Sequence, residues 1–373
     1  MRYAFFVIII ALLQAFSLGA VLSLQWWLQP WLTSSLNIAV WALIFLMTNA
    51  LLLITFSKRF DNSYRWMSAW LLVMHFMMLT ALVTSLCYAA YELLIVSSAT
   101  HSSETVRIGL RGLALVVFIA LFVYSLYCAY APVVRRLSIV IDKPLKSSLR
   151  IAMASDLHLG KLFGNKAIDK LHQLITANKA DMLLMPGDIM DDNIKAYSAY
   201  NMSSRLKSLC SSLPYGVYAT LGNHDLYGHE QPISNALRSA GVHLLNDEVL
   251  SLEYKGESIW LVGRFDNHKR QRVATTELLA QVDSTQPVIL LDHRPSDIVQ
   301  HSKLPIDLQV SGHTHDGQIF PANFIVRAIN RLGYGYEAIN QGHFVVSSGY
   351  GFWGIPFRLG SRAEIWIIDV TGK

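Results

Sequence analysis

The stretch Val310–Gln318 reads VSGHTHDGQ, in which two histidines stand one residue apart between glycines. A short apolar run, Ile306–Val310, comes just before it, so the histidines are expected to follow the end of a buried strand. Imidazole is a common metal ligand. A single His-x-His turn is more often an ordinary polar loop, so its meaning depends on the rest of the chain.

Polar residues follow four more predicted strands in the same way. Together with the two histidines, the set is Asp156, His158, Asp188, Asn223, His293, His313 and His315. Because sites in open α/β sheets form at the carboxyl ends of strands, these groups are expected to converge although they are distant in sequence. Carboxylates, an amide and imidazoles without a thiolate suit manganese, iron or zinc better than a soft copper site.

This set holds too many groups for one tetrahedral ion. Its seven groups suffice for two ions if one carboxylate bridges them. Two metal ions about 3.5–4 Å apart polarise a phosphoryl oxygen and generate hydroxide near neutral pH. Glycines stand directly before Asp188, Asn223 and His313, where they are expected to let the backbone turn sharply beside the ions.

The order of the motifs carries a family resemblance. They are DLH at 156–158, GDIMD at 187–191, GNHD at 222–225, a single His at 293 and GHTH at 312–315. This ordered set resembles the calcineurin-like metallophosphoesterase superfamily, whose pattern is D-x-H, G-D-x-x-D, G-N-H-D/E, H and G-H-x-H. The resemblance implies an αββα sandwich and a metal-dependent hydrolase of phosphoric esters or anhydrides. It also implies two divalent ions, with manganese expected first and iron or zinc as alternatives.

The same resemblance assigns roles to single residues. One metal would take Asp156, His158, Asp188 and His315, and the other Asp188, Asn223, His293 and His313. His224 would protonate the leaving oxygen or stabilise charge on the phosphate, and Asp225 would orient His224 through a hydrogen bond. Asp191 is expected to contact the metal ligands without binding a metal ion itself. Asp316 stands where similar sequences often carry Gly, and this extra carboxylate is expected to influence the choice of metal.

From Leu137 onward, short apolar runs alternate with amphipathic segments. The predicted strands are Leu137–Ile141, Arg150–Ser155, Met182–Met185, Gly216–Thr220, Ile259–Val262, Val288–Leu291, Leu308–Val310, Phe344–Val346 and Ile365–Val370. Apolar residues at helical spacing in Ala167–Ala177 and Ile233–Ala240 complete an α/β pattern. The excess of strands over helices favours two stacked sheets with flanking helices. Residues 137–373 are therefore assigned to one metallophosphoesterase domain.

Residues 1–134 differ sharply in composition. The chain of 373 residues is 53% hydrophobic and 15% charged, and the apolar excess lies almost entirely before Val134. The runs Ala4–Leu28, Leu36–Ser57, Trp66–Tyr91 and Gly112–Val134 each reach the roughly 20 residues that a spanning helix needs. The first run is too long for a signal peptide, and three more follow it. We therefore predict a transmembrane region of four helices.

Basic residues near the ends of these runs set the expected orientation. The loop Gln29–Ser35 has none, whereas the second loop and the segment after the fourth run carry Lys58, Arg59, Arg65, Arg135, Arg136, Lys143 and Lys146. Arg107 and Arg111 in the third loop oppose this trend. The best assignment is a multi-pass protein of the cell (inner) membrane with a cytoplasmic catalytic domain. Polar residues in or near the spans are expected to form hydrogen bonds between helices, namely Gln14, Gln25, Asn37, Asn49 and His75.

Two further stretches bear on the substrate. LLDHRP at 290–295 and SSGYGFWGIPFRLGSRAEI at 347–365 resemble a membrane-associated subgroup, some members of which act on the pyrophosphate of UDP-2,3-diacylglucosamine. A tethered site gains effective concentration only for lipid-borne substrates, which favours a lipid-linked phosphate or pyrophosphate ester. The aromatic loop Gly349–Phe357 would line a pocket, touch the bilayer or pack in the core. The basic run Asp266–Arg272 would meet a phosphate or anionic lipid, or form a solvated face.

Other functions stay open at this point. A nuclease or cyclic-nucleotide phosphodiesterase could use the same metal core, and a membrane sensor or transporter could carry a domain that only binds metal. The formal net charge of +5 is mild for this length, so no nucleic acid is expected as a partner. The proton donor His224 argues against a pure binding module. Phosphate-containing substrates and membrane lipids are the partners that the sequence favours.

Overall fold

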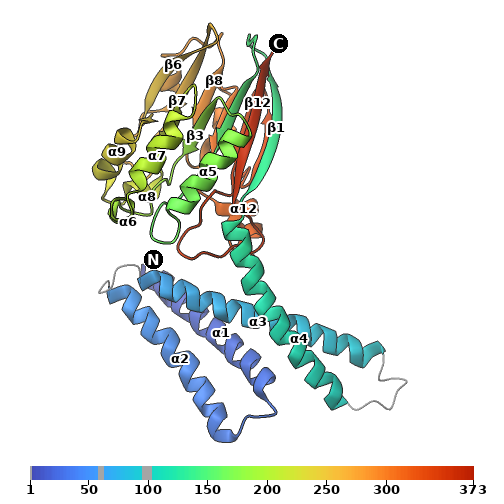
Figure 1. Cartoon of the computed structure of the whole chain (residues 1–373). Helices are drawn as coiled ribbons and strands as arrows, with labels where there is room; N and C mark the ends of the chain where they lie inside the picture. Colours follow the sequence, from blue (N-terminus) through green and yellow to red (C-terminus); the bar gives the residue numbers. More distant parts are fainter. Residues whose placement is uncertain (1, 58–62, 95–102) are drawn as a thin grey trace. The chain divides into compact units, whose positions relative to one another are not determined.

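The protein is described here by a computed structural model that covers residues 2–57, 63–94 and 103–373 (Figure 1). The chain divides into two compact units, residues 1–125 and residues 126–373. The division falls inside a helix, so the last turn of that helix belongs to the second unit.

Long apolar helices make up the first unit. They are α1 (Arg2–Leu28), α2 (Ser34–Ser57), α3 (Ser63–Leu94) and α4 (Ser103–Tyr130). Among the described residues, these four helices are long and apolar enough to cross a membrane, as predicted. Lys58 and Arg59, and the loop residues 95–102, lie outside the described residues, and the predicted orientation rests partly on them.

Polar side chains join these helices to one another. Gln14 Nε2 donates to Asn49 Oδ1 at 3.1 Å, and the amides of Gln25 and Asn37 also pair. Because lipid tails offer polar groups no partners, such pairs fix which helix faces meet. The prediction of interhelical hydrogen bonds is therefore confirmed for these four residues. His75 stacks on the Phe16 ring.

The fourth apolar run ends earlier than predicted. The run was expected to reach Val134, but α4 stops at Tyr130 and Val133 already pairs with Glu364 in the first strand of the second unit. Pro132 has no amide hydrogen and cannot continue the helix. The strand predicted from Leu137 therefore begins four residues sooner, and only two residues separate the helix from it.

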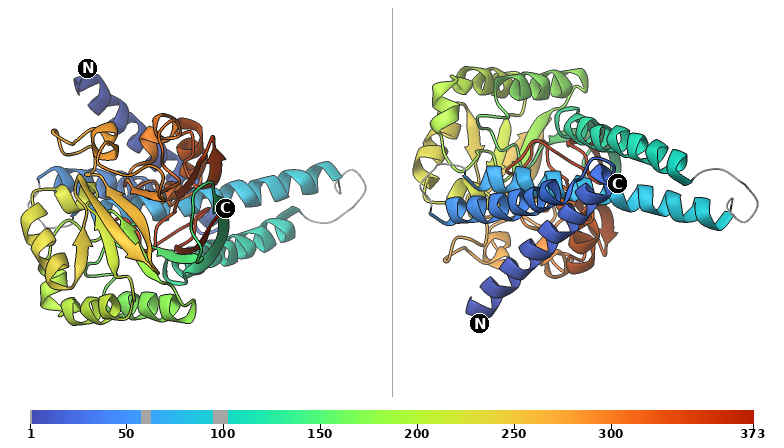
Figure 2. Two further views of the ribbon diagram at one scale, coloured as in Figure 1. Left: turned by 90° about the horizontal axis from the view of Figure 1, so that it is seen from above. Right: turned by 90° about the horizontal axis from the view of Figure 1, so that it is seen from below.

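Two six-stranded sheets form the second unit (Figures 1 and 2). The first has the order β1 (Val133–Ile141), β12 (Glu364–Gly372), β2 (Leu149–Met153), β3 (Met182–Pro186), β4 (Val217–Thr220) and β5 (Val242–Leu244). The second has the order β10 (Gly335–Ile339), β11 (Gly342–Val346), β9 (Leu308–Ser311), β8 (Val288–Leu291), β7 (Glu257–Gly263) and β6 (Glu248–Tyr254).

The core lies in layers because strand residues alternate between faces. Leu183 of β3 packs outward with helices α5 (Asn165–Ala177), α7 (Met202–Ser211) and α9 (Glu230–Ser239). Leu184, its neighbour, points inward and packs against Leu291 and Leu308 of the second sheet. The outer face of the second sheet is covered by α10 (Thr275–Leu279), α11 (Ile298–His301) and neighbouring loops. This is the predicted αββα sandwich.

Every strand predicted for this unit is present, but three strands were missed. They are β5, which has only three residues, and β6 and β10, which lie at the two edges of the second sheet. Edge strands bury little, and both β6 and β10 consist mostly of exposed or half-buried residues. They therefore lack the apolar run on which strand prediction depends.

The layer between the sheets should dominate the stability of this unit. Leu184→Ala would open a cavity there and lower the free energy of unfolding by about 2–5 kcal/mol. Val299→Ala, at a side chain that is 46% exposed, should change it by only about 0.5 kcal/mol or less. Denaturant unfolding of the purified full-length protein in detergent measures both. Equal effects of the two substitutions would contradict this layering.

Candidate metal centre

The loops after five strands bring the predicted ligands to one edge of the sandwich. In the first sheet, β2, β3 and β4 are adjacent and parallel, and in the second sheet so are β8 and β9. Their carboxyl ends therefore point the same way, and each strand delivers its loop to the same region. The site is built from both sheets, so it depends on how the sheets pack.

Two clusters of potential ligand atoms lie there. Asp156, His158 and His315 form the first cluster, with 3.2 Å between the Nε2 atoms of the two histidines. Asp188, His293 and His313 form the second, with His293 Nε2 3.2 Å from Asp188 Oδ2. Asp188 Oδ2 is also 3.9 Å from His158 Nε2, so this carboxylate reaches both clusters. The structure thus brings together six of the seven predicted ligands with Asp188 between them.

Asn223, the seventh, is oriented for the same role. Its Nδ2 donates to the hydroxyl of Tyr227 at 2.9 Å, whereas its buried Oδ1 has no hydrogen-bond partner among the described residues. His293 Nδ1 lies 2.9 Å from the carbonyl of Pro186, which leaves the buried Nε2 directed at Asp188 Oδ2, 3.2 Å away. Buried polar atoms rarely stay unpaired. These atoms are suitable ligands for divalent cations, and a bound cation would be the partner that Asn223 Oδ1 lacks.

Backbone strain is concentrated at the ligands. Five of them have left-handed backbone angles, with φ between 45° and 71°: Asp156, His158, Asp188, His313 and His315. Such angles are uncommon for residues other than glycine and tend to mark functional sites. The sharp turns predicted for the preceding glycines are thus made mostly by the ligands themselves.

The glycines are needed for space more than for angle. Only Gly187 of the three has a positive φ, at 84°. A Cβ at Gly222 would overlap the Asp188 carboxylate, and one at Gly312 would overlap that of Asp156. The loops therefore approach the carboxylates more closely than any side chain allows.

Burial tunes these groups for cation binding. It lowers the pKa of His158 and of His313 to about 3, so both imidazoles are neutral near neutral pH. Burial also lowers the pKa of His293, but the neighbouring carboxylate of Asp188 outweighs this effect and raises the pKa to about 10. His293 in turn holds the pKa of Asp188 below its usual range although burial opposes this. A cation held by Asp188 and His293 would take the place of the proton that the two side chains share.

The prediction that Asp225 orients His224 through a hydrogen bond is wrong. Asp225 does not contact its imidazole but accepts the backbone N–H groups of Ile189, Met190 and Gly222 at 2.8–3.1 Å. Asp225 thereby ties the loops after β3 and β4 together. Both carboxylate oxygens are thereby directed at backbone N–H groups rather than at the imidazole of His224.

Asp192 holds His224 instead. Its Oδ1 lies 2.5 Å from His224 Nδ1, and burial, which lowers the pKa of His224, is outweighed by this bond and by Asp188, so that the pKa is raised. The sequence carries two adjacent aspartates after the GDIM motif, and the family pattern points to the first. That first residue, Asp191, lies against Gly160.

Asp316 is also directed away from the centre. Its two oxygens bind Arg327 at 2.9 and 2.8 Å, so the expected influence on the metal has no direct contact to support it. A third acidic cluster, Asp292, Asp297 and His301, is filled by the guanidinium of Arg264, 3.0–3.2 Å from all three. An arginine at its centre leaves no room for a cation.

Arg358 was not singled out by the sequence. It is fully buried and donates to the carbonyls of Ser348 and Gly351 at 2.7 and 2.6 Å, and it lies 3.1 Å from His315 Nδ1. It connects the loop after β11 to a metal-ligand loop. No local sequence pattern predicts this buried arginine, because its partners are backbone carbonyls of its own irregular loop and the imidazole of His315, which is distant in sequence.

A cavity of about 260 Å³ opens beside the clusters. Its lining includes Asp188, His224, His313, His315, Gln318 and Trp353. Trp353 is 47% exposed, and Gln318 binds its backbone on both sides, whereas Tyr350 and Phe352 of the same loop are buried. The aromatic loop therefore serves in part as core and in part as the wall of the site.

The basic run at 266–272 is largely neutralised. Lys269 pairs with Glu230 at 2.7 Å and Arg272 with Asp297 at 2.8 Å. Asp266 accepts from Arg294 at 2.6 Å. These contacts support the interpretation of a solvated, ion-paired face over that of a phosphate site.

Comparisons with known proteins agree on one family. The model of the calcineurin-like phosphoesterases matches residues 149–317. An uncharacterised metallophosphoesterase of Helicobacter pylori is 33% identical over 65% of each chain, and one of Campylobacter jejuni is 32% identical over 70% of this chain and 71% of its own. A transmembrane protein with metallophosphoesterase domain from Bos taurus is 31% identical over 70% of this chain and 63% of its own.

A solved structure is similar over a comparable part of the chain. It is that of a 5'-nucleotidase precursor from Thermus thermophilus, which is 14% identical over 60% of this chain and 55% of its own, with a TM-score of 0.39. The matches to the Helicobacter and Bos taurus proteins leave about a third of those chains unmatched.

The close approach of Gly222 to Asp188 can be tested by metal content. In Gly222→Ala the added methyl group would displace the Asp188 carboxylate, so the purified full-length protein should lose most of its bound divalent metal. Gly109→Ala is a matched control, because its methyl group meets no atom within 4 Å. Elemental analysis after manganese loading and desalting gives the comparison. Equal metal content in the two variants would show that Asp188 is not held in this way.

Proposed function

The chain belongs to the calcineurin-like metallophosphoesterase family, and on this premise we propose that it is a membrane-anchored hydrolase of phosphate ester or pyrophosphate bonds. The family consists of metal-dependent phosphoester hydrolases. The observation that carries the proposal is the pair of ligand clusters joined by Asp188 at the floor of an open cavity. A module that only binds metal would have no need for a proton donor such as His224 beside the clusters.

The residues around the cavity are proposed to hold two cations. We assign one cation to Asp156, His158, Asp188 and His315, and the other to Asp188, Asn223, His293 and His313. Bound cations supply Lewis-acid activation of the phosphoryl group and of the attacking water. Manganese is the expected metal, because oxygen and imidazole ligands without thiolate suit it.

His224 would complete the reaction by giving a proton to the leaving oxygen. It lies at the cavity wall, and its Nδ1 is engaged by Asp192, which leaves Nε2 for the substrate. The raised pKa of His224 favours the protonated imidazole that a general acid needs. Its backbone N–H donates to Asp188 Oδ1 at 2.8 Å, which places the proton donor next to the cation site.

The substrate is proposed to be borne by a lipid, and the catalytic unit to be cytoplasmic at the inner membrane. Basic residues 135, 136, 143 and 146 directly after the last span support this orientation. The last turn of α4 is bound to the catalytic unit, with Ala363 N donating to the carbonyl of Cys128 at 2.9 Å. A site held so close to the end of a spanning helix gains effective concentration for lipid-linked phosphates.

The decisive experiment is an assay of the full-length protein in detergent with manganese, in which alkyl and nitrophenyl phosphate mono- and diesters are compared. Turnover should require metal, and His224→Ala should lower kcat by about 10²-fold or more on an alkyl ester. The loss should be much smaller on a nitrophenyl ester, whose leaving group needs no proton. His172→Ala, on the outer helix α5, is the control. Metal binding without turnover of any ester would favour a sensor and end the proposal.

Asp192→Asn tests how His224 is positioned. A neutral amide cannot hold the imidazolium as the carboxylate does, so kcat on the alkyl ester should fall by about 10–100-fold while the metal content stays unchanged. As for His224→Ala, the loss should shrink on the nitrophenyl ester. Asp225→Asn should instead disturb the loops and reduce bound metal. An equal loss on both esters for Asp192→Asn would assign it a purely structural role.

A further inference from the structure

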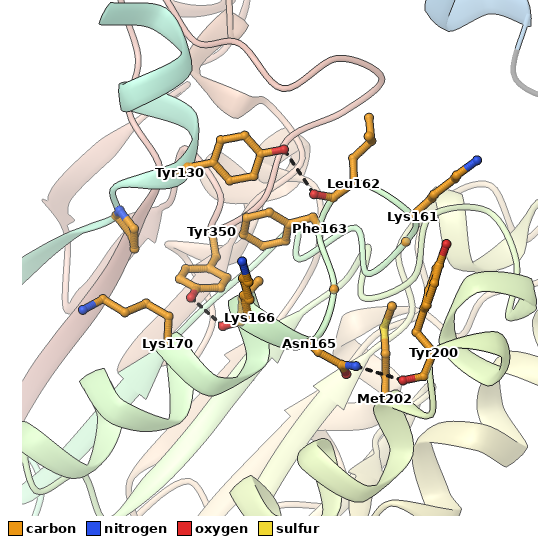
Figure 3. A pocket seen from close by; sticks show the side chains of 14 residues that line it. Tyr130, Lys161, Leu162, Phe163, Asn165, Lys166, Lys170, Tyr200, Met202 and Tyr350 are labelled. Atoms are coloured by element: carbon orange, nitrogen blue, oxygen red, sulfur yellow. Dashed lines mark hydrogen bonds between the residues drawn. The ribbon is translucent and has the colours of Figure 1, made fainter. Parts of the chain in front are cut away.

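A second cavity of about 500 Å³ lies in the same unit, and its lining shares no residue with the cavity of the metal centre. Residues from four segments form it: the end of α4, the loop before α5 with its first turns, residues 200–202, and Tyr350 (Figure 3). We refer to it as the lysine pocket, after Lys161, Lys166 and Lys170. It has no part in the proposed reaction.

The pocket carries positive charge that the protein does not neutralise. All three lysines are exposed, and no acidic residue lines the cavity. Among the described residues, the one hydrogen-bond partner of their ammonium groups is the amide of Gln173, 3.1 Å from Lys170. Figure 3 shows Lys166 in the middle of the pocket, with Lys161 and Lys170 on either side of it. Such a row of unpaired cations favours an anionic ligand.

The floor of the pocket is apolar and aromatic. Phe163 packs edge-on against Tyr350, with 5.4 Å between the ring centroids, and Tyr130 lies 6.2 Å from Phe163. The hydroxyls of Tyr130 and Tyr350 donate to the carbonyls of Leu162 and Ala167, respectively. The faces of the two rings therefore remain available for apolar contact. Leu162 and Tyr200 are 42% and 49% exposed at the rim. A ligand that fits must therefore combine an anion with an apolar part.

The place of the pocket in the chain indicates the source of such a ligand. Tyr130 is the last residue of α4, a helix long and apolar enough to span a membrane, and it lines the pocket directly. Tyrosines are enriched where spanning helices leave the hydrocarbon, at the level of lipid headgroups. The pocket thus opens where phosphates and acyl chains are both at hand. A soluble phosphate would match only the lysines.

We propose that the lysine pocket binds an anionic phospholipid of the bilayer, with its phosphate at Lys166 and its acyl chain against Phe163, Leu162 and Tyr200. Asn165 adds a detail. Its Nδ2 donates to the carbonyl of Tyr200 at 2.8 Å, while its buried Oδ1 has no hydrogen-bond partner among the described residues. Because that oxygen is buried, the choice of headgroup rests on charge: the lysines favour a net-anionic glycerol headgroup over a zwitterionic choline headgroup.

Native mass spectrometry of the delipidated full-length protein in neutral detergent tests this. Dioctanoyl phosphatidylglycerol should bind more tightly than dioctanoyl phosphatidylcholine, which has the same chains. The triple variant K161Q/K166Q/K170Q should lose about tenfold or more of its affinity for the glycerol lipid. The control K146Q/K179Q/K303Q removes the same charge from exposed lysines elsewhere and should bind as the unchanged protein does.

Further variants separate the parts of the proposal. L162S/Y200S keeps the lysines and should also weaken binding of the glycerol lipid, because the acyl contact is lost. His224→Ala should bind it normally, so failed catalysis and failed lipid binding stay distinguishable. Equal affinity for the two lipids, or equal loss in both lysine triples, would overturn the proposal. Displacement of the lipid by an equal concentration of inorganic phosphate would assign the pocket to a soluble anion instead.

Discussion

The buried charge of Asp188 is the constraint on which the second unit depends. This carboxylate is 2% exposed, stands at the end of β3 in the first sheet, and meets His293 from β8 in the second sheet. A buried carboxylate without a partner would be very unfavourable, so the contact with His293 stabilises the approach of the loop after β3 to the loop after β8. The same contact places the loops of both sheets around one point. Packing of the sandwich and assembly of the site are therefore a single problem.

The cost of that assembly falls on the backbone. Five ligands adopt left-handed angles, and Gly222 and Gly312 leave no space for a side chain beside the carboxylates. Two buried side chains stabilise these strained loops through hydrogen bonds. Asp225 accepts from backbone N–H groups of the ligand loops, and Arg358 donates to backbone carbonyls of the loop after β11. Neither residue needs to touch a cation or a substrate. They hold the strained loops in the arrangement in which the ligand atoms converge.

Sequence reasoning succeeded where the signal is local or ordered along the chain. Apolar runs gave the four long helices and the central strands, and the order of the motifs identified the family and the residues that meet at the site. It failed where the partner is chosen in space. Asp192 rather than Asp225 binds His224, and the spacing of the motifs alone does not show which aspartate of these loops reaches the imidazole. Likewise, exposed edge strands such as β6 and β10 carry no buried pattern to detect.

The junction between α4 and β1 links the anchor to the chemistry. Only Ala131 and Pro132 separate the helix from the strand, and Arg362 secures the junction by donating to the carbonyl of Ala131 and to the hydroxyl of Tyr127. A long flexible linker would let a catalytic unit sample soluble substrates far from the bilayer. Here the last helical turn is fixed to the unit by hydrogen bonds and aromatic packing, with Tyr130 5.4 Å from Phe352.

Phe352 belongs to the same loop as Trp353, which lines the metal cavity. The segment that borders the proposed active site is thus the segment that grips the end of the membrane helix. Such a short, hydrogen-bonded connection leaves the last turn of α4 little freedom to move independently of the catalytic unit.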